Sequence, residues 1–262
     1  MAAIGFIGAS GLMGHGIAKN LIAKGHVLSL TVHRNREGVA DLLAAGAKQC
    51  GSAAELAATS EMVFLCVTGS PQVEASLTGT SGLLAGAKRG LVIVDCSTSE
   101  PDSTARLRET CAQAGVVLVD APLARTPIEA EAGKLNCMVG ADDATFAKLD
   151  PVLRAFAENV FHVGGPGAGH IIKLLNNFIA QAICTATAEA FAVGQRAEVA
   201  GESLRHHLED ARVDGAHRDD VDQLLRVDAG ALADRERFGG GSADRLGDEV
   251  AVSYTHLRAH ET

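Results

Sequence analysis

The sequence predicts an α/β fold, with an N-terminal doubly wound parallel sheet over residues 1–163 followed by the start of an all-α domain. Three observations carry this prediction. Short apolar runs alternate with helical patterns as far as residue 163, and a glycine-rich turn separates the first strand from the first helix. A second glycine-rich stretch at residues 164–169 then ends the alternation and opens a long apolar helix, which runs from residue 171 to about residue 196.

The predicted strands are short apolar runs of the kind that parallel sheets bury on both faces. They lie at residues 3–7, 28–32, 62–67, 91–94, 116–119, 135–139 and 160–163. Helical spacing of apolar residues starts near residue 11 and recurs at residues 38–45, 103–114 and 142–157. This alternation is typical of a doubly wound sheet that has helices on both faces.

The glycine-rich turn after the first strand has the pattern that binds the pyrophosphate of a dinucleotide. One glycine permits the tight turn, one lets backbone N–H groups approach the pyrophosphate, and one lets helix and strand pack closely. The start of the following helix favours anions. The spacing is G-x-x-G-x-x-G, one residue longer than G-x-G-x-x-G, and an ordinary tight turn is the alternative. We predict a Rossmann domain whose cofactor contacts include Gly8, Ser10, Gly11, Leu12, Met13 and Gly14.

The residues after the second strand predict the choice between NAD and NADP. Sites that prefer NAD place an Asp or Glu here for the ribose 2′-hydroxyl, whereas an Arg accommodates the 2′-phosphate of NADP. This chain has His33-Arg34-Asn35-Arg36, with no carboxylate before Glu37. Guanidinium groups bind phosphate through paired, charge-assisted hydrogen bonds. We therefore expect Arg34, Asn35 and Arg36 to select NADP(H), with NAD as the second possibility and a solvated charge cluster as the alternative.

Composition excludes several classes of function. A net charge of −9 argues against a nucleic-acid partner, which needs a basic face. No segment is expected to span a membrane, and the chain enters a strand at once without a signal-type sequence. The cysteines form no C-x-x-C pair, so we expect reduced, mostly buried thiols in a cytoplasmic protein without a metal site. They are Cys50, Cys66, Cys96, Cys111, Cys137 and Cys184.

The composition changes after about residue 196. All seven lysines lie at or before Lys173, whereas the last 67 residues contain nine arginines and fifteen acidic residues but no Lys, Ile or Met. Such a shift is typical of GC-rich DNA translated out of frame, and residues 252–262 resemble a translated sequencing adapter. We assign residues 164–196 to a long interdomain helix and expect residues 197–262 to be a non-native or disordered tail of a truncated or frame-shifted chain. A genuine charged tail is the alternative.

Four motifs occur in a recognisable order. After the glycine turn come Asp95-Cys96-Ser97-Thr98, the segment at residues 120–126, the glycines at residues 164–169, and Lys173 followed by Asn176-Asn177. Over residues 3–195 this order resembles the β-hydroxyacid dehydrogenase family, also called 3-hydroxyisobutyrate dehydrogenase-like. Residues 124–126 are Ala-Arg-Thr where the family usually has Ser-Gly-Gly, which is similar to its 3-sulfolactaldehyde reductase branch.

Lys173 has the chemistry that hydride transfer at an alcohol requires. Oxidation needs a group that removes the hydroxyl proton, and reduction needs the same group to return it. Lys173 lies in an apolar helix, where desolvation lowers a lysine pKa, and Asn176 and Asn177 share its face. A lysine that snorkels from a buried helix is the alternative. The resemblance implies that Lys173 and Asn177 are catalytic and that Asn176 binds substrate.

Two further loops follow predicted strands at the carboxyl edge of the sheet, where open α/β folds bind ligands. The resemblance implies that Ser97 contacts the substrate and is catalytic, and that Thr98 lies near the nicotinamide. A helix N-cap is the alternative for both. Val67 and Thr68 stand where the family has Leu-Pro beside the nicotinamide ribose.

The loop at residues 124–126 supplies a candidate for substrate recognition. Arg125 can clamp a carboxylate or sulfonate with two hydrogen bonds, assisted by the Thr126 hydroxyl, and a surface salt bridge is the alternative. The family also has a second lysine, in a Lys-Asp-Leu segment, near the substrate acid group. This chain has no such segment, which predicts an incomplete active site.

Together these observations predict an NADP(H)-dependent oxidoreductase that interconverts a small β-hydroxyacid or hydroxysulfonate and its aldehyde or keto form. An imine reductase-type enzyme is one alternative, although such enzymes usually lack the lysine. A dinucleotide-binding module without catalysis is the other. The resemblance implies a homo-oligomer for an intact member of the family, and we expect impaired assembly for this chain.

Overall fold

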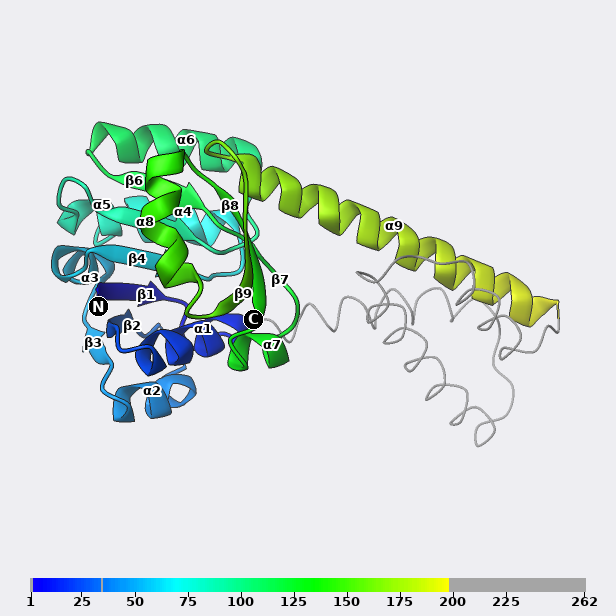
Figure 1. The fold of residues 1–262 in the computed structure, drawn as a ribbon, viewed down its shortest axis with the longest axis horizontal. Coiled ribbons are helices and arrows are strands. Elements are labelled where there is room, and N and C mark those ends of the chain that lie inside the picture. The colour runs from blue at the N-terminus through cyan, green and yellow to red at the C-terminus, as the bar shows by residue number, and fades with distance from the viewer. Residues whose placement is uncertain (1, 34, 198–262) are drawn as a thin grey trace. The chain divides into compact units, whose positions relative to one another are not determined.

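The computed structural model describes residues 2–33 and 35–197 (Figure 1). The chain divides into two units, of which one extends through Leu174 and the other begins at Leu175. The predicted domain boundaries at residues 163 and 196 remain predictions. The predictions for Arg34 and for the tail at residues 198–262 fall outside the described residues.

Six parallel strands form the first part of the sheet, in the spatial order β3-β2-β1-β4-β5-β6. They are β1 (Ala3–Ile7), β2 (Val27–Thr31), β3 (Lys48–Cys50), β4 (Met62–Leu65), β5 (Val92–Asp95) and β6 (Val117–Asp120). The chain first moves from β1 to β2 and β3, and then crosses back to β4 on the other side of β1. This reversal of strand order opens a crevice at the carboxyl ends of β1 and β4, where ligands of such folds bind.

The other part of the sheet contains three further strands, which are β7 (Leu123–Ala124), β8 (Leu135–Gly140) and β9 (Ala157–Gly164). Of these, β8 and β9 run opposite to the first six strands, and β7 runs in the same direction as them. β8 pairs antiparallel with β6 and β7, and β9 pairs parallel with β8. The strands predicted at residues 135–139 and 160–163 are therefore present, but they run against the first six. The sheet is mixed at this edge.

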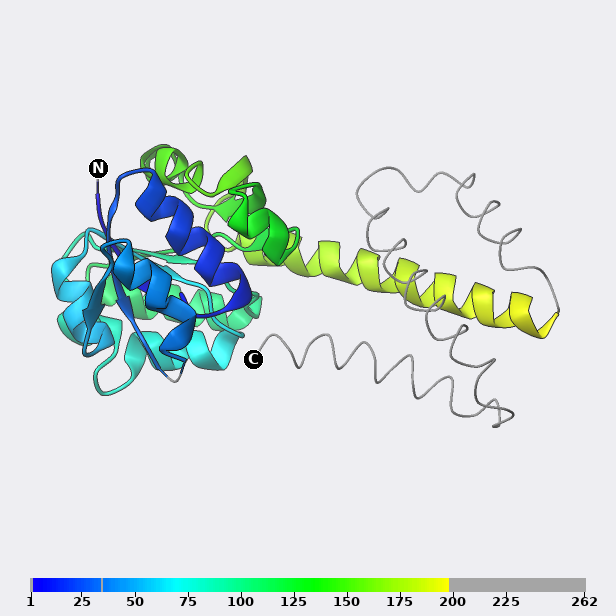
Figure 2. The same cartoon turned by 90° about the horizontal axis from the view of Figure 1, so that it is seen from below.

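Helices cover both faces of the sheet, as Figures 1 and 2 show. One apolar cluster contains core residues of α1, α2 and α8, and the other contains those of α3, α4, α5 and α6. Along β4, Phe64 belongs to the first cluster and its neighbours Val63 and Leu65 to the second, because successive side chains of a strand point to opposite faces. The predicted fold class is confirmed. The helices that precede the long C-terminal helix are α1 (Leu12–Ala23), the 3₁₀ turn η1 (Glu37–Val39), α2 (Ala40–Ala44), α3 (Ala53–Thr59), α4 (Ser70–Thr78), α5 (Leu83–Gly86), α6 (Pro101–Gln113), α7 (Pro127–Glu131) and α8 (Asp143–Leu153).

The long helix α9 (Ala168–Arg196) follows the glycines that were predicted to open it. Its segment Ala168–Gly194 is long and apolar enough to cross a membrane, by length and composition alone. The expectation that no segment meets this criterion was wrong, because the sparse charges of the helix leave a continuous apolar stretch. A single such helix is weak support for a membrane span, since core helices of soluble proteins pass the same test.

Candidate active site

The glycine turn joins β1 to α1 with very little free space. Gly8 has a φ of +95°, and a Cβ there would lie 2.0 Å from the Cys66 carbonyl oxygen. A Cβ on Gly14 would lie 2.1 Å from the Gly8 carbonyl oxygen. Gly11 is the N-cap of α1, makes no side-chain cap hydrogen bond, and is followed by a first turn without an acidic residue. The start of α1 is therefore suited to an anion.

A cavity of about 500 Å³ opens over this turn. Ser10, Gly11 and Leu12 line it from the turn, and residues of η1, α2 and α7 line its other sides. Three of the predicted cofactor contacts thus share one cavity. Met13 is half-buried and Gly14 is buried.

Charged side chains that the sequence analysis did not select form one wall of this cavity. His15 Nδ1 lies 2.5 Å from Glu131 Oε1, and His15 Nε2 lies 3.0 Å from Asp41 Oδ2. Lys19 donates to the other Glu131 oxygen at 2.8 Å. Burial lowers the pKa of His15, but its bonds to Glu131 and Asp41 outweigh burial and raise that pKa above the ordinary value. These residues are far apart in the sequence, so no local pattern identifies the cluster.

The segment after β2 carries the residues predicted to select NADP. Asn35 Oδ1 accepts a hydrogen bond from the Gly38 backbone at 2.9 Å, so this side chain closes the turn before α2. Arg36 is exposed and is the N-cap residue of η1.

The loops after β4 and β5 contact each other directly. The Val67 backbone N–H donates to Ser97 Oγ at 3.0 Å, and β4 and β5 are adjacent parallel strands. Ser97 is buried, whereas Thr98 and Thr68 are exposed. The two loops therefore lie side by side at the carboxyl edge of the sheet.

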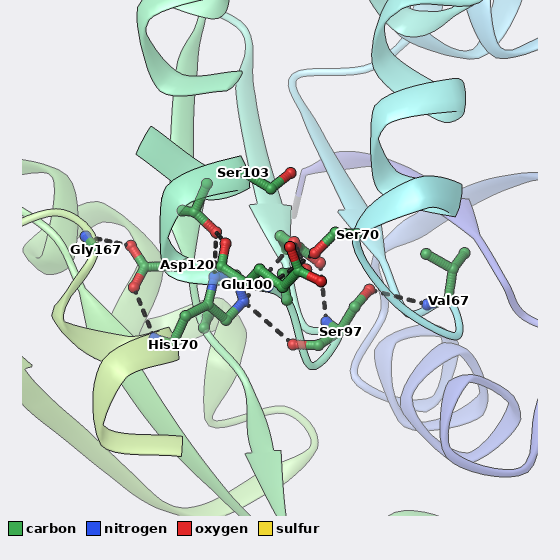
Figure 3. A network of polar contacts seen from close by, with 12 residues as sticks. Val67, Ser70, Ser97, Glu100, Ser103, Asp120, Gly167 and His170 are labelled. Atoms are coloured by element: carbon green, nitrogen blue, oxygen red, sulfur yellow. Dashed lines mark hydrogen bonds and ion pairs between the residues drawn. The ribbon is translucent and has the colours of Figure 1, made fainter. Parts of the chain in front are cut away.

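A buried polar network extends from Ser97 to the start of α9 (Figure 3). Asp95 ends β5, and its carboxylate accepts from Ser97 N at 2.9 Å and from Ser99 Oγ at 2.8 Å. His170 of α9 is fully buried and lies with Nε2 3.2 Å from the Ser97 carbonyl oxygen and 3.7 Å from Asp95 Oδ2. Its Nδ1 lies 2.8 Å from Thr104 Oγ1. One histidine therefore connects α6, α9 and the loop after β5.

Asp120, at the end of β6, makes a second connection to the same helix (Figure 3). It is fully buried, and its carboxylate accepts from Gly167 N at 2.7 Å and from His170 N at 3.0 Å. A Cβ on Gly140 or Gly169 would lie 2.5 or 2.9 Å from Asp120 Oδ2, so these glycines leave room for the carboxylate. The first turn of α9 is thus held at the ends of two neighbouring strands.

Lys173 follows His170 by three residues on α9 and belongs to the same compact unit. Residues three apart share one side of a helix, about 4.5 Å apart along its axis. Lys173 is half-buried. Asn176, which is exposed, and Asn177, which is half-buried, follow on α9 and belong to the second unit.

Arg125 and Thr126 have local partners. Arg125 Nη1 lies 2.5 Å from both the Lys134 carbonyl oxygen and Glu158 Oε2, as the salt-bridge alternative anticipated. Among the described residues, Arg125 is also the one non-glycine residue with a positive φ, +83°. The Thr126 hydroxyl caps α7, accepting from Ile128 N and donating to Glu129 at 2.5 Å.

Cysteine and metal chemistry have little support at this site. Burial raises the pKa of Cys66, Cys111 and Cys137 to about 12, so these thiols stay protonated at neutral pH. In the part of the chain that the structure describes, no group of three or more His, Cys, Asp or Glu residues is placed to hold a metal ion.

Comparison with known proteins gives a consistent result. Residues 3–164 match the family model for the NAD binding domain of 6-phosphogluconate dehydrogenase. The chain is 36% identical over 202 residues to 2-(hydroxymethyl)glutarate dehydrogenase of Eubacterium barkeri, covering 77% of this chain and 66% of that protein. It is 34% identical to 3-hydroxyisobutyrate dehydrogenase of Pseudomonas aeruginosa, covering 74% and 64%. It is 32% identical to 3-sulfolactaldehyde reductase of Escherichia coli, covering 72% and 63%.

A solved structure of Psf3 in complex with NADP⁺ has a TM-score of 0.74 to this chain at 27% identity, covering 87% of this chain and 79% of that one. The curated relatives extend beyond the match, because the chain spans 63–66% of their length.

Proposed function

Because the chain belongs to the β-hydroxyacid dehydrogenase family, we propose that it is an NADP(H)-dependent oxidoreductase. Its reaction interconverts a small β-hydroxyacid, or a hydroxysulfonate, and the corresponding aldehyde or keto acid. The observation that carries this proposal is the buried attachment of α9 to the carboxyl ends of β5 and β6, which supports a location for Lys173 beside the Ser97–Thr98 loop.

The residues of the first unit fit a nicotinamide dinucleotide. The close approach at Gly8 and Gly14 and the uncapped start of α1 suit a pyrophosphate, and the adjoining cavity has room for an attached nucleoside. When bound, the cofactor supplies or accepts the hydride. The turn and α1 bind it, and the loops that carry Val67 and Thr98 border its reactive end.

Lys173 moves the proton in this proposal. In reduction its ammonium donates a proton to the carbonyl oxygen as the carbonyl carbon gains a hydride, and in oxidation the neutral amine removes the hydroxyl proton. Ser97 Oγ already accepts from Val67 N, which leaves the Ser97 hydroxyl hydrogen available for a substrate oxygen. Asn176 and Asn177 orient the substrate and the lysine.

Preference for NADP(H) over NAD(H) rests on Arg34 and on the exposed Arg36. The Psf3 structure contains NADP⁺, which supports the same cofactor for a protein of this fold. NAD(H) is the second candidate, because Glu37 and Asp41 line the cavity and are suited to ribose hydroxyls.

Arg125 and the names of the relatives support the proposed substrate class. 2-(Hydroxymethyl)glutarate and 3-hydroxyisobutyrate are acids, and 3-sulfolactaldehyde is a sulfonate. A guanidinium can bind either acid group through two charge-assisted N–H···O hydrogen bonds. Arg125 reaches a substrate through the nitrogens that do not contact Glu158, or by exchanging that partner, since exposed ion pairs contribute only about 0–1 kcal/mol.

The oligomeric state and the cellular location of the protein are also proposals. We infer a cytoplasmic protein whose partner is a small molecule, with homo-oligomers expected for an intact member of the family.

Imine reductases share the fold, at 16–18% identity over the solved structures. Lys173 favours the alcohol chemistry over that alternative.

The test is turnover by the full chain. Purified protein is mixed with NADPH or NADP⁺ and a panel of β-hydroxyacids, 3-sulfolactaldehyde and a cyclic imine, and the NADPH absorbance is followed. Turnover of the acids supports the proposal. Turnover of the imine alone would favour the imine reductase alternative, and tight NADPH binding without any turnover would favour a binding module.

A further inference from the structure

Among the described residues, the two fully buried polar residues contact each other at the start of α9, and a third buried acid lies beside them. Asp120 and His170 are both fully buried, and Asp95 is nearly so. Burying a charged or polar group costs free energy unless hydrogen bonds satisfy it. A sequence that keeps three such groups together therefore gives up apolar packing there in exchange for a specific geometry.

The geometry fixes the orientation of one helical turn. Asp120 accepts two backbone N–H groups from this turn, from Gly167 and His170, and a carboxylate at the start of a helix is also favoured by the helix dipole. The imidazole of His170 is held on both sides, by Thr104 Oγ1 at 2.8 Å and by the Ser97 carbonyl oxygen at 3.2 Å. Rotation of α9 about its axis would break these contacts together.

We propose that Asp120 and His170 are positioning residues for Lys173. They fix the register and rotation of the first turn of α9 against the Ser97 loop, and so set where the lysine amine lies one turn later. This inference rests on the proposed function of Lys173. It assigns to two residues without substrate contact a defined effect on proton transfer, because a displacement of about 1 Å from the productive geometry costs as much as 10²-fold in rate.

The first experiment compares two helix-capping aspartates in the full chain. Asp120→Asn replaces one acceptor oxygen by an NH₂ donor that faces a backbone N–H. Asp142→Asn is the matched control, because Asp142 caps α8 through the Thr145 N–H at 2.9 Å and lies outside the proposed site. We expect Asp120→Asn to lower kcat by about 10- to 10²-fold with KM and NADPH affinity nearly unchanged. We expect the control to leave kcat unchanged.

A second pair separates positioning from simple packing. His170→Gln retains an amide that can donate to the Ser97 carbonyl oxygen, whereas His170→Leu fills the space without any hydrogen bond. Positioning predicts that His170→Gln recovers most of the kcat that His170→Leu loses, measured well below the melting temperature of each variant. Equal kcat in both variants and in the parent protein would overturn the proposal.

A third experiment measures the chemical reactivity of the Lys173 amine and does not depend on turnover. An amine-reactive acylating reagent is applied to each variant, and labelling of Lys173 is compared with labelling of the exposed Lys148 on α8 by mass spectrometry. Positioning predicts that Asp120→Asn changes the Lys173 to Lys148 ratio and accelerates amide hydrogen exchange at residues 168–173, while Asp142→Asn does neither. Unchanged labelling and exchange in Asp120→Asn would refute it.

Lys173→Ala separates this inference from the proposed function. Loss of kcat in Lys173→Ala with full kcat in Asp120→Asn and His170→Leu overturns the positioning role alone. Full kcat in Lys173→Ala overturns the function proposed for the lysine, whatever the other variants show.

Discussion

Replacing Gly8 by alanine tests whether the turn after β1 holds the cofactor. The φ of +95° costs a non-glycine residue about 1–3 kcal/mol. For a chain of this size that lowers the melting temperature by about 2–12 °C. The new Cβ would also lie 2.0 Å from the Cys66 carbonyl oxygen, a full 1 Å inside the 3.0 Å below which real contacts essentially never occur. Either β4 or the turn must move.

Gly46→Ala is the matched control, since Gly46 has a φ of +102° and a Cβ added there would meet nothing within 4 Å. Gly46→Ala has the same backbone strain as Gly8→Ala, but its Cβ does not collide with another atom and it lies away from the glycine turn. We expect Gly8→Ala to be destabilised more than Gly46→Ala. If the displaced turn loses one hydrogen bond to a phosphate, worth about 1.5–3 kcal/mol, its NADPH dissociation constant rises about 10- to 150-fold.

Thermal unfolding and isothermal titration with NADPH measure both effects. Gly46→Ala should bind NADPH as the parent protein does. Unchanged NADPH affinity in Gly8→Ala would refute the placement of the pyrophosphate on this turn, even if the stability falls as expected.

Three further predictions concern other parts of the site. Arg34→Asp should narrow or reverse the preference for NADPH over NADH, and equal affinities of the parent protein for both cofactors, measured by titration, would contradict the NADP assignment. Because the pKa of His15 is raised in the folded state, its bonds to Glu131 and Asp41 stabilise the fold most below the unfolded-state pKa of about 6.5, and this contribution is lost as the pH rises through the folded-state pKa. Urea unfolding of the parent protein and His15→Gln should therefore show a stability difference that shrinks with rising pH; a difference that grows would show that the sign is wrong. Arg125→Ala should mainly raise KM for acid substrates, since it removes ground-state binding, and a fall in kcat at constant KM would point to another role.

The strongly patterned parts of the fold could be predicted from the sequence. β1, the glycine turn and α1 follow from an apolar run and fixed glycine spacing, whereas the place of β1 between β2 and β4 was not predicted. The unpredicted β3 (Lys48–Cys50) is an edge strand whose first two residues, Lys48 and Gln49, are exposed, so it has no apolar run to find. The predicted helix at residues 142–157 ends earlier, at Leu153, because residues from Ala157 onward pair with β8.

The functional site was predictable only where a motif is local. Asp95 and Asp120 stand first in two of the motifs, yet their role depends on backbone N–H groups and a histidine more than 45 positions away. His170 lies among the glycines and Lys173, but nothing in its neighbours shows that it is buried. The one sequence feature that could have indicated the buried network is the presence of Asp95 and Asp120 at the ends of two predicted strands. The direction of Arg125 toward Glu158 follows from the pairing of β8 with β9, which local sequence does not specify.

The role proposed for Lys173 is tested by the kcat of Lys173→Ala in the full chain, with saturating NADPH and an acid aldehyde substrate. General acid–base catalysis contributes about 10²- to 10⁴-fold in rate, so kcat should fall by that factor while NADPH affinity stays the same, because the turn at Gly8 is untouched. A near-normal kcat would contradict the β-hydroxyacid mechanism and leave imine reduction as the function to test.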